Sequence, residues 1–331
     1  MSSRTVLLNR VIHPEALRRL QAEVQVIEAY TAPAAELVAL LGTVQGLVLG
    51  AGFSVGGAEL DQADTLEVIG RHGVGLDNVD VAAASQRRIP VTYTPDGPTE
   101  STAEHALLLI LATARRLSQL DRAVRSGAFD IRNDPAAMGR ELDGLTLGVV
   151  GFGRIGRRLA AMCRDALHMA IYVYDPYLSP EAVAAGGGTW VGDLRELARQ
   201  VDVLSIHTPL TPETRGLIGP EVLRAIQPGA ILVNTSRGPV VDETALIEAL
   251  QDGRLGGAGL DVYVSQPPAP GSPLLAMDQV VLTPHVGSFT QEGRLRMGLT
   301  VVEDVLRALR GERPQFLANP QVWPRRRRRT R

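Results

Sequence analysis

One stretch decides the fold of this chain: Leu147-Gly148-Val149-Val150-Gly151-Phe152-Gly153-Arg154-Ile155-Gly156. Four residues typical of a short strand run directly into the pattern Gly-x-Gly-x-x-Gly, and a helical pattern follows. In such a unit the first glycine permits the tight turn, the second lets a pyrophosphate approach the backbone, and the third lets the helix pack on the sheet. The helix N-terminus then offers free N–H groups to the phosphates. We therefore predict a dinucleotide-binding loop made by Gly151, Gly153, Arg154, Ile155 and Gly156.

An acidic residue follows this loop at the distance that the motif requires. The next strand-like run ends at Asp175, about 20 residues beyond Gly156. A carboxylate at this place accepts hydrogen bonds from the adenosine ribose hydroxyls and repels the 2′-phosphate of NADP. The predicted cofactor is therefore NAD.

Strand-like apolar runs alternate with helical patterns along almost the whole chain, which is typical of βαβ units and parallel sheets. The later runs are nearly continuous in apolar character, as expected for strands buried on both faces. We predict an α/β protein with two doubly wound parallel-sheet domains. A Rossmann NAD-binding domain of about six strands, residues 102–287, is inserted in a flavodoxin-like substrate domain, residues 1–101 and 288–331. The predicted strands are 6–8, 24–27, 46–49, 66–69, 90–93, 147–150, 171–174, 201–206, 230–234, 257–260 and 280–283.

Two long helices are predicted between these blocks. The first spans about 101–126 and opens with a capping box, because Ser101 is followed three positions later by Glu104. The second spans about 289–310 and ends at Gly311. The segment from Ala106 to Leu117 is apolar around much of its circumference and needs cover on most sides.

The composition excludes several classes of function. The 331 residues include one cysteine and no lysine, so we predict no cysteine-based metal cluster, no metal site and no lysine-based covalent catalysis. No apolar run reaches the roughly 18 residues of a membrane span, and no signal peptide is evident, so we expect a cytoplasmic protein. Six arginines lie between Arg325 and Arg331, which leaves an acidic body that does not favour nucleic acid. We interpret this tail as a disordered terminus, with binding of an anionic partner as the alternative.

Six motifs, in this order along nearly the whole chain, resemble those of the D-isomer-specific 2-hydroxyacid dehydrogenases. The resemblance implies an NAD-dependent oxidoreductase that moves a hydride between nicotinamide and a small 2-keto or 2-hydroxy acid. The family also implies a homodimer with its contact near the helix that contains residues 106–117. The motifs are residues 73–80, 151–156, 207–211, 234–238, 259–263 and 283–287.

The resemblance also assigns the catalytic groups. Arg237 follows a strand at its C-terminal end, where its guanidinium could bind the substrate carboxylate and polarise the keto oxygen. His285 would serve as the acid/base, because imidazole titrates near neutral pH. The backbone N–H groups of Val74 and Gly75 would receive the substrate carboxylate. The implied further cofactor contacts are Thr102, His207, Thr208, Pro209, Thr235, Asp261 and Gly287.

The loop after the third strand bears on the substrate. Residues 49–54 contain no cation for a substrate phosphate, and Phe53 suggests an apolar wall. We therefore expect an unphosphorylated acid such as glyoxylate or hydroxypyruvate. His72 either flanks the substrate pocket or lies on the polar surface, and His105 is interpreted as a helix-packing residue.

Gln266 departs from the family pattern. Most members have a glutamate here that pairs with the catalytic histidine, whereas a neutral amide can orient the ring but supplies no charge. We therefore expect a lower pKa for His285 than a His–Glu pair would give.

Two alternatives remain, and the first of them follows from this departure. NAD-dependent formate dehydrogenases are similar in this region and carry a Gln–His pair, although the segment 94–99 lacks the asparagine expected to hold formate. The C-terminal binding proteins, which use an NAD-bound dimer as an interaction platform, resemble the same dehydrogenases. Intact Arg237 and His285 favour the enzyme.

Overall fold

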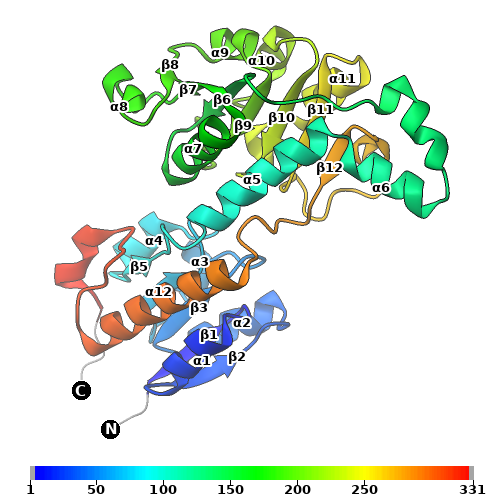
Figure 1. The fold of residues 1–331 in the computed structure, drawn as a ribbon. Helices are drawn as coiled ribbons and strands as arrows, with labels where there is room; N and C mark the ends of the chain where they lie inside the picture. The colour runs from blue at the N-terminus through cyan, green and yellow to red at the C-terminus, as the bar shows by residue number, and fades with distance from the viewer. Residues whose placement is uncertain (1–3, 328–331) are drawn as a thin grey trace. The chain divides into compact units, whose positions relative to one another are not determined.

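The computed structural model describes residues 4–327, and the chain divides into two compact units (Figure 1). The first unit contains the chain up to Thr99 and from Ser288 onward, and the second runs from Glu100 to Gly287. Each unit is built on one sheet whose strands all pair in parallel, with helices between successive strands. The predicted α/β class is confirmed.

The first unit has a five-stranded sheet in the order β2-β1-β3-β4-β5, the order of flavodoxin-like sheets. Alternate residues of its strands face opposite layers: Leu7 packs in one core, while Val6 and Leu8 pack in the other. The strands are β1 (Thr5–Leu8), β2 (Gln25–Glu28), β3 (Gly46–Leu49), β4 (Val68–Arg71) and β5 (Val91–Thr92). The helices are α1 (Pro14–Gln21), α2 (Ala34–Leu41), α3 (Gly57–Leu60), α4 (Val81–Gln86) and α12 (Gln291–Arg310), with the 3-10 helix η5 (Pro320–Arg325) after α12.

Helix α12 returns the chain to the first unit and lies beside α1 (Figure 1). It begins after Thr290, whose hydroxyl accepts a hydrogen bond from the N–H of Gly293, and it ends at Gly311 with a left-handed φ of 88°. It packs closely on β4, because a Cβ added at Gly70 would lie 2.5 Å from a methyl carbon of Val305. The predicted end of this helix is confirmed.

The second unit has a seven-stranded sheet in the order β12-β11-β10-β9-β6-β7-β8. Counted from β6, this is the Rossmann order 3-2-1-4-5-6 with one further strand. The prediction of about six strands missed β8, whose two exposed residues form no apolar run. The strands are β6 (Thr146–Val150), β7 (Ala170–Tyr174), β8 (Thr189–Trp190), β9 (Val203–Ile206), β10 (Ala230–Asn234), β11 (Leu255–Leu260) and β12 (Val280–Leu282). The helices are α5 (Thr99–Ala114), α6 (Leu117–Arg125), α7 (Arg154–Leu167), α8 (Pro180–Ala184), α9 (Leu194–Gln200), α10 (Pro220–Ala225) and α11 (Glu243–Gln251), with 3-10 helices η1 (Phe129–Asn133), η2 (Pro135–Ala137), η3 (Gly238–Val240) and η4 (Pro273–Ala276).

The single helix predicted over 101–126 is wrong. Arg116 has a φ of 54°, a left-handed conformation that interrupts a right-handed helix, so the chain forms α5 and α6 instead. The predicted capping box is also wrong, because Ser101 lies inside α5 and is buried.

Three further observations concern the described residues. None of their helices is long and apolar enough to span a membrane. No group of three or more His, Cys, Asp or Glu among them could hold a metal ion. The interpretation of the arginine tail as disordered is wrong for Arg325 to Arg327, since Arg325 lies in η5 and the N–H of Arg327 donates to the carbonyl of Arg88 (2.8 Å). Residues 328–331 of the predicted tail lie outside the described residues.

Candidate functional site

The glycine loop joins β6 to α7 as the motif predicts. Gly151 has a φ of 88°, and a Cβ there would lie 3.0 Å from the carbonyl carbon of His207. A Cβ at Gly156 would lie 2.4 Å from the carbonyl oxygen of Gly151, so the third glycine allows α7 to pack on the loop. A Cβ at Gly153, by contrast, would meet no atom within 4 Å. The open side of the loop is therefore at Gly153, directly before Arg154 and Ile155 in the first turn of α7.

Asp175 lies directly after β7 and contacts the glycine loop. One of its carboxylate oxygens accepts a hydrogen bond from the N–H of Phe152 (2.9 Å), and the other accepts one from the N–H of Tyr177 (3.0 Å). A carboxylate has about four acceptor positions, so both oxygens can accept further bonds. Asp175 therefore orders the loop and retains the capacity to accept ribose hydroxyls.

The chain after β9 and β10 brings together polar groups that fit a dinucleotide. The hydroxyl oxygens of Thr208 and Thr235 are buried and have no hydrogen-bond partner in the described part of the chain. Such groups carry a desolvation cost that a polar ligand can relieve. His207, which precedes Thr208 and Pro209, hydrogen-bonds Ser205 (2.9 Å), and burial lowers its pKa to about 4. His207 is therefore neutral at physiological pH.

Arg237 lies in a turn that Asn234 organises. The Asn234 side chain donates to the carbonyl of Arg237 (2.9 Å) and accepts from the N–H and hydroxyl of Ser236 (3.0 and 2.9 Å). Gly238 then packs against Tyr263 so closely that a Cβ would lie 2.0 Å from the Tyr263 carbonyl carbon. Asn234 is 1% exposed. It belongs to the motif 234–238, but no role was predicted for it, because its hydrogen bonds to Ser236 and Arg237 are made only in the folded turn.

His285 and Gln266 are brought together by the fold. His285 Nδ1 lies 2.9 Å from Gln266 Oε1, and both side chains are exposed. The histidine has a left-handed φ of 57°, directly after Pro284. An amide oxygen at Nδ1 favours the tautomer with its proton on Nδ1, which leaves Nε2 for acid/base exchange.

Asp261 holds the loop that carries His285. Its Oδ1 accepts hydrogen bonds from the Thr283 hydroxyl (2.6 Å) and the N–H of Val286 (2.8 Å), and its Oδ2 accepts one from the N–H of Gly287 (2.8 Å). Burial alone would raise the pKa of Asp261, but hydrogen bonds from His105, Thr283 and the two backbone groups outweigh it and lower the pKa. The carboxylate is therefore charged and committed to this loop, while its predicted contact with the nicotinamide carboxamide stays a prediction.

His105 and Thr102 bring α5 against the same loop. His105 Nε2 lies 2.9 Å from the Thr283 hydroxyl and 3.3 Å from the Asp261 carboxylate, so its role exceeds the helix packing expected of it. Thr102 is buried, and a Cβ added at Gly287 would lie 3.4 Å from its methyl carbon. Both residues therefore support the loop of His285.

The predicted substrate residues of the first unit lie at the C-terminal ends of β3 and β4. The carbonyl of Gly73 accepts from the N–H of Thr94, and the carbonyl of Gly75 accepts from Arg71 (3.0 Å each). The N–H groups of Val74 and Gly75 donate to no described residue. This arrangement fits a ligand that accepts hydrogen bonds, such as a carboxylate.

Phe53 and His72 are both buried in the first unit. Phe53 packs in the core of the first unit, and Asn78 donates to the carbonyls of Phe53 and Gly50 (2.8 Å each). Its role as a wall of the substrate pocket stays a prediction. His72 is 3% exposed, which makes the polar-surface alternative wrong.

Comparison with known proteins places these residues in a family. Residues 107–287 match the NAD binding domain of the D-isomer specific 2-hydroxyacid dehydrogenases. This chain belongs to that family. The matched part is thus a nicotinamide dinucleotide-binding domain, and the recognition made from the six motifs is confirmed.

Relatives of known name agree with this assignment. D-3-phosphoglycerate dehydrogenase of Archaeoglobus fulgidus is 40% identical over 92% of this chain, and glyoxylate reductase of Korarchaeum cryptofilum is 43% identical over 79% of each chain. This chain spans only 57% of the length of the Archaeoglobus protein. Among solved structures, the NADPH-dependent glyoxylate/hydroxypyruvate reductase of Sinorhizobium meliloti has a TM-score of 0.87 and 32% identity, with 99% of this chain and 100% of that chain covered.

The Asp261 geometry makes a prediction for stability. An Asp261→Asn change places an amide where only an acceptor fits and should lower the free energy of unfolding by about 1–3 kcal/mol at pH 7. The folded-state pKa of Asp261 is lowered, so its stabilisation is present above the unfolded-state pKa and is lost as pH falls through the folded pKa. The difference between wild type and variant should therefore shrink below about pH 4 in urea unfolding followed by circular dichroism.

The control for this experiment is Asp64→Asn, which removes an exposed carboxylate and should change stability by less than about 0.5 kcal/mol. A difference for Asp261→Asn that stays constant from neutral to acid pH would contradict the assigned role of its charge.

Proposed function

We propose that this protein catalyses the NAD-dependent interconversion of a small, unphosphorylated 2-keto acid and its 2-hydroxy acid. The observation that carries the proposal is the His285–Gln266 pair on a loop held by Asp261, at the same sheet edge as the glycine loop and Arg237. Ligands of parallel sheets bind outside the carboxyl ends of the strands, where all these residues lie. In this proposal the first unit binds the substrate and the second unit binds the cofactor.

The residues divide the chemistry between them. NADH, when bound, supplies the hydride that adds to the keto carbon. The N–H groups of Val74 and Gly75 hold the substrate carboxylate, and the Arg237 guanidinium polarises the keto oxygen as negative charge develops there. His285 donates a proton from Nε2 to that oxygen during reduction and removes it during oxidation. Gln266 orients the ring from Nδ1.

Asp175 supports NAD rather than NADP as the cofactor of this chain. Its carboxylate lies against the glycine loop, where it can accept ribose hydroxyls and would repel a 2′-phosphate. The Sinorhizobium relative is described as NADPH-dependent, so cofactor choice varies among similar proteins and must be measured for this one.

Turnover tests this proposal directly. NADH absorbance should fall with glyoxylate, hydroxypyruvate or pyruvate, and NADPH should serve less well. An Arg237→Met variant should lose about 10²–10³ in kcat, because it removes a donor to the developing oxyanion. Arg254→Met is the matched control, since Arg254 lies in the same unit and its guanidinium donates to the carbonyl of Arg224, which is not a predicted site residue.

Two other reactions, measured in the same experiment, distinguish the proposed function from the alternatives. Reduction of NAD by formate alone would replace the proposal with formate oxidation, for which an orienting Gln266 suffices. Oxidation of D-3-phosphoglycerate in preference to unphosphorylated acids would contradict the expected substrate class, which rests on the cation-free segment 49–54.

The Gln266–His285 pair predicts a pH effect. In a Gln266→Glu variant the new carboxylate would stabilise the imidazolium and raise the pKa of His285. The acid limb of the oxidation profile and the basic limb of the reduction profile should both move to higher pH. The control is Gln251→Glu, which adds the same charge at an exposed position on α11. Identical pH profiles for wild type and Gln266→Glu would show that the pair does not set the titration.

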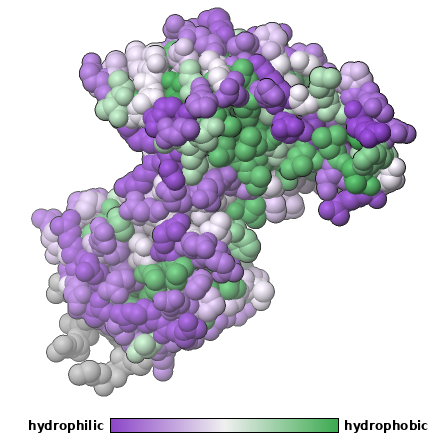
Figure 2. Space-filling view, in the orientation of Figure 1, coloured by the Kyte–Doolittle hydropathy of each residue, from purple (hydrophilic) through white to green (hydrophobic). Residues whose placement is uncertain are grey.

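We also propose that the protein is a homodimer through α5 and α6. Helix α6 buries none of its residues, although Leu117 and Val124 are more than half exposed. Figure 2 shows hydrophobic residues gathered over the part of the second unit that carries these helices. The exposed apolar side chains of this region are Leu108, Leu111, Leu117, Val124, Phe129 and Met138.

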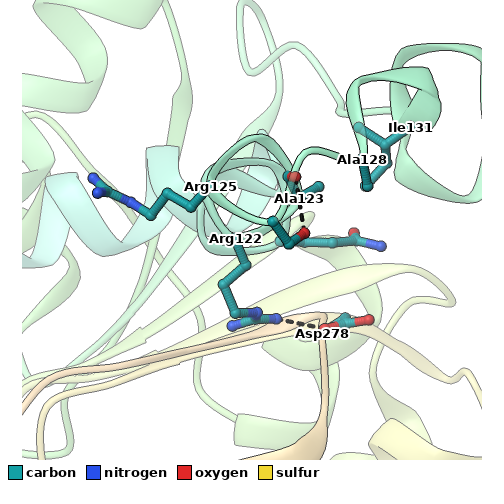
Figure 3. Close-up of a pocket in the computed structure, with 8 residues that line it drawn as sticks. Arg122, Ala123, Arg125, Ala128, Ile131 and Asp278 are labelled. Atoms are coloured by element: carbon teal, nitrogen blue, oxygen red, sulfur yellow. Dashed lines mark hydrogen bonds and ion pairs between the residues drawn. The ribbon is translucent and has the colours of Figure 1, made fainter.

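A pocket lies in the same region. It has a volume of about 660 Å³ and contains none of the predicted site residues, so it is not the candidate active site. Figure 3 shows Arg122 of α6 paired with Asp278, while Ala128 and Ile131 stand beside the helix. An apolar surface with a hollow of this kind fits contact with a second copy of the chain.

The dimer is tested by mass in solution. Light scattering after size exclusion should give twice the chain mass for wild type, and Val124→Glu should shift the population toward monomer by placing charge in the contact. Val11→Glu, at a half-exposed position of the first unit, should leave the mass unchanged. A monomeric wild type would contradict the proposal.

A further inference from the structure

Arg71 is a buried residue at the end of β4 that the proposed chemistry does not use. Its Nε donates to the carbonyl of Gly75 (3.0 Å), and its Nη1 donates to the carbonyl of His72 (2.5 Å) and, more weakly, to that of Leu49 (3.4 Å). A Cβ added at Gly73 would lie 2.9 Å from Nη1, so the loop wraps closely around the guanidinium. One side chain thus ties the two ends of the loop to β3.

This contact affects the two free N–H groups. In a trans peptide the N–H points opposite to the carbonyl of the same plane. The Gly73 carbonyl accepts from Thr94, which turns the Val74 N–H away from β5. The carbonyl of Gly75 accepts from Arg71, which fixes the peptide plane after Gly75. The bond from Thr94 fixes the peptide plane before Val74. The N–H of Gly75 lies in the plane between these two, so its orientation is restricted. The orientation of both N–H groups therefore depends on Thr94 and Arg71.

Positive charge surrounds the base of this loop. Arg10 follows β1 and lies against Gly50, where a Cβ would be 2.4 Å from that of Arg10. Arg294 donates to the carbonyl of Val11 (2.7 Å). Among the described residues no carboxylate forms an ion pair with Arg10. The guanidinium groups of Arg10, Arg71 and Arg294 therefore contribute a positive field at His72.

His72 does not offset this field. Its two ring nitrogens are buried without a hydrogen-bond partner in the described part of the chain. Burial, and then the charges of Arg10, Arg71 and Arg294, lower its pKa to about 3. The imidazole is therefore neutral at physiological pH and contributes no charge of either sign.

We propose that Arg71 is a positioning residue that presents the N–H groups of Val74 and Gly75 to the substrate carboxylate and favours an anionic ligand there. The inference rests on the proposed function, because it concerns the same carboxylate. Arg71 acts through the backbone of the loop, and its planar fork is needed because the carbonyls of His72 and Gly75 must be held together.

The test compares Arg71→Met and Arg71→Lys with wild type. Both variants should raise KM for the 2-keto acid by about tenfold or more, because each loses the fork that holds the loop. The kcat should stay within about twofold and the Kd for NADH should not change, since the cofactor residues lie in the second unit. An unchanged KM in both variants, or a KM fully restored by lysine, would overturn the positioning role.

Arg87→Met is the matched control. Arg87 also donates to two backbone carbonyls of the first unit, those of Ala83 and Gly57, and pairs with Asp61. Its loss should cost similar stability and leave KM at the wild-type value. An equal rise of KM in this variant would show that the effect of Arg71 is a general loss of stability.

Binding of oxamate, a small unreactive carboxylate, to the NADH-loaded protein separates this inference from the proposed function. If wild type turns over no 2-keto acid, the proposed function fails, and the same titration still decides on Arg71. Weaker oxamate binding by Arg71→Met than by wild type supports the inference. Equal binding, or no binding by wild type, overturns it.

Discussion

The candidate active site depends on the hydrogen bonds that the buried carboxylate of Asp261 accepts. It lies at the end of β11 and is 1% exposed, so its charge carries a large desolvation cost. Three hydrogen bonds from Thr283, Val286 and Gly287 offset that cost, and each comes from the loop that carries His285. Because most of the hydrogen bonds to this charge come from one loop, the conformation of the loop that carries His285 is coupled to the stability of the second unit.

Each of the two sheets has polar groups at the carboxyl ends of its strands. The second sheet gathers the glycine loop, Asp175, Arg237 and the His285 loop along one edge. In the first unit, the loop after β4 has two N–H groups that donate to no described residue, and three guanidinium charges act on His72 in the same loop. In the proposed function, anion recognition is assigned to the first unit and hydride transfer to the second, because ligands of parallel sheets bind outside the carboxyl ends of the strands.

The neutral partner of His285 is the chemical feature that separates this chain from the common family pattern. A glutamate would add charge, whereas Gln266 supplies a neutral acceptor oxygen 2.9 Å from Nδ1. A carboxylate partner would both orient the imidazole ring and supply a negative charge. Gln266 can orient the ring but supplies no charge.

The sequence by itself determined the fold class, the dinucleotide loop, the family and the pairing of Gln266 with His285. These depend on local chemistry: apolar runs of strand length, glycines where a backbone must turn or approach, and residues at set places in ordered motifs. Only the tertiary structure decided the break at Arg116, the short strand β8, and the contacts of Asn234, Asp261 and Arg71. A left-handed residue in a helical pattern leaves no periodic signal. A buried carboxylate or guanidinium acquires its role from carbonyls and N–H groups that the fold brings to it from other strands.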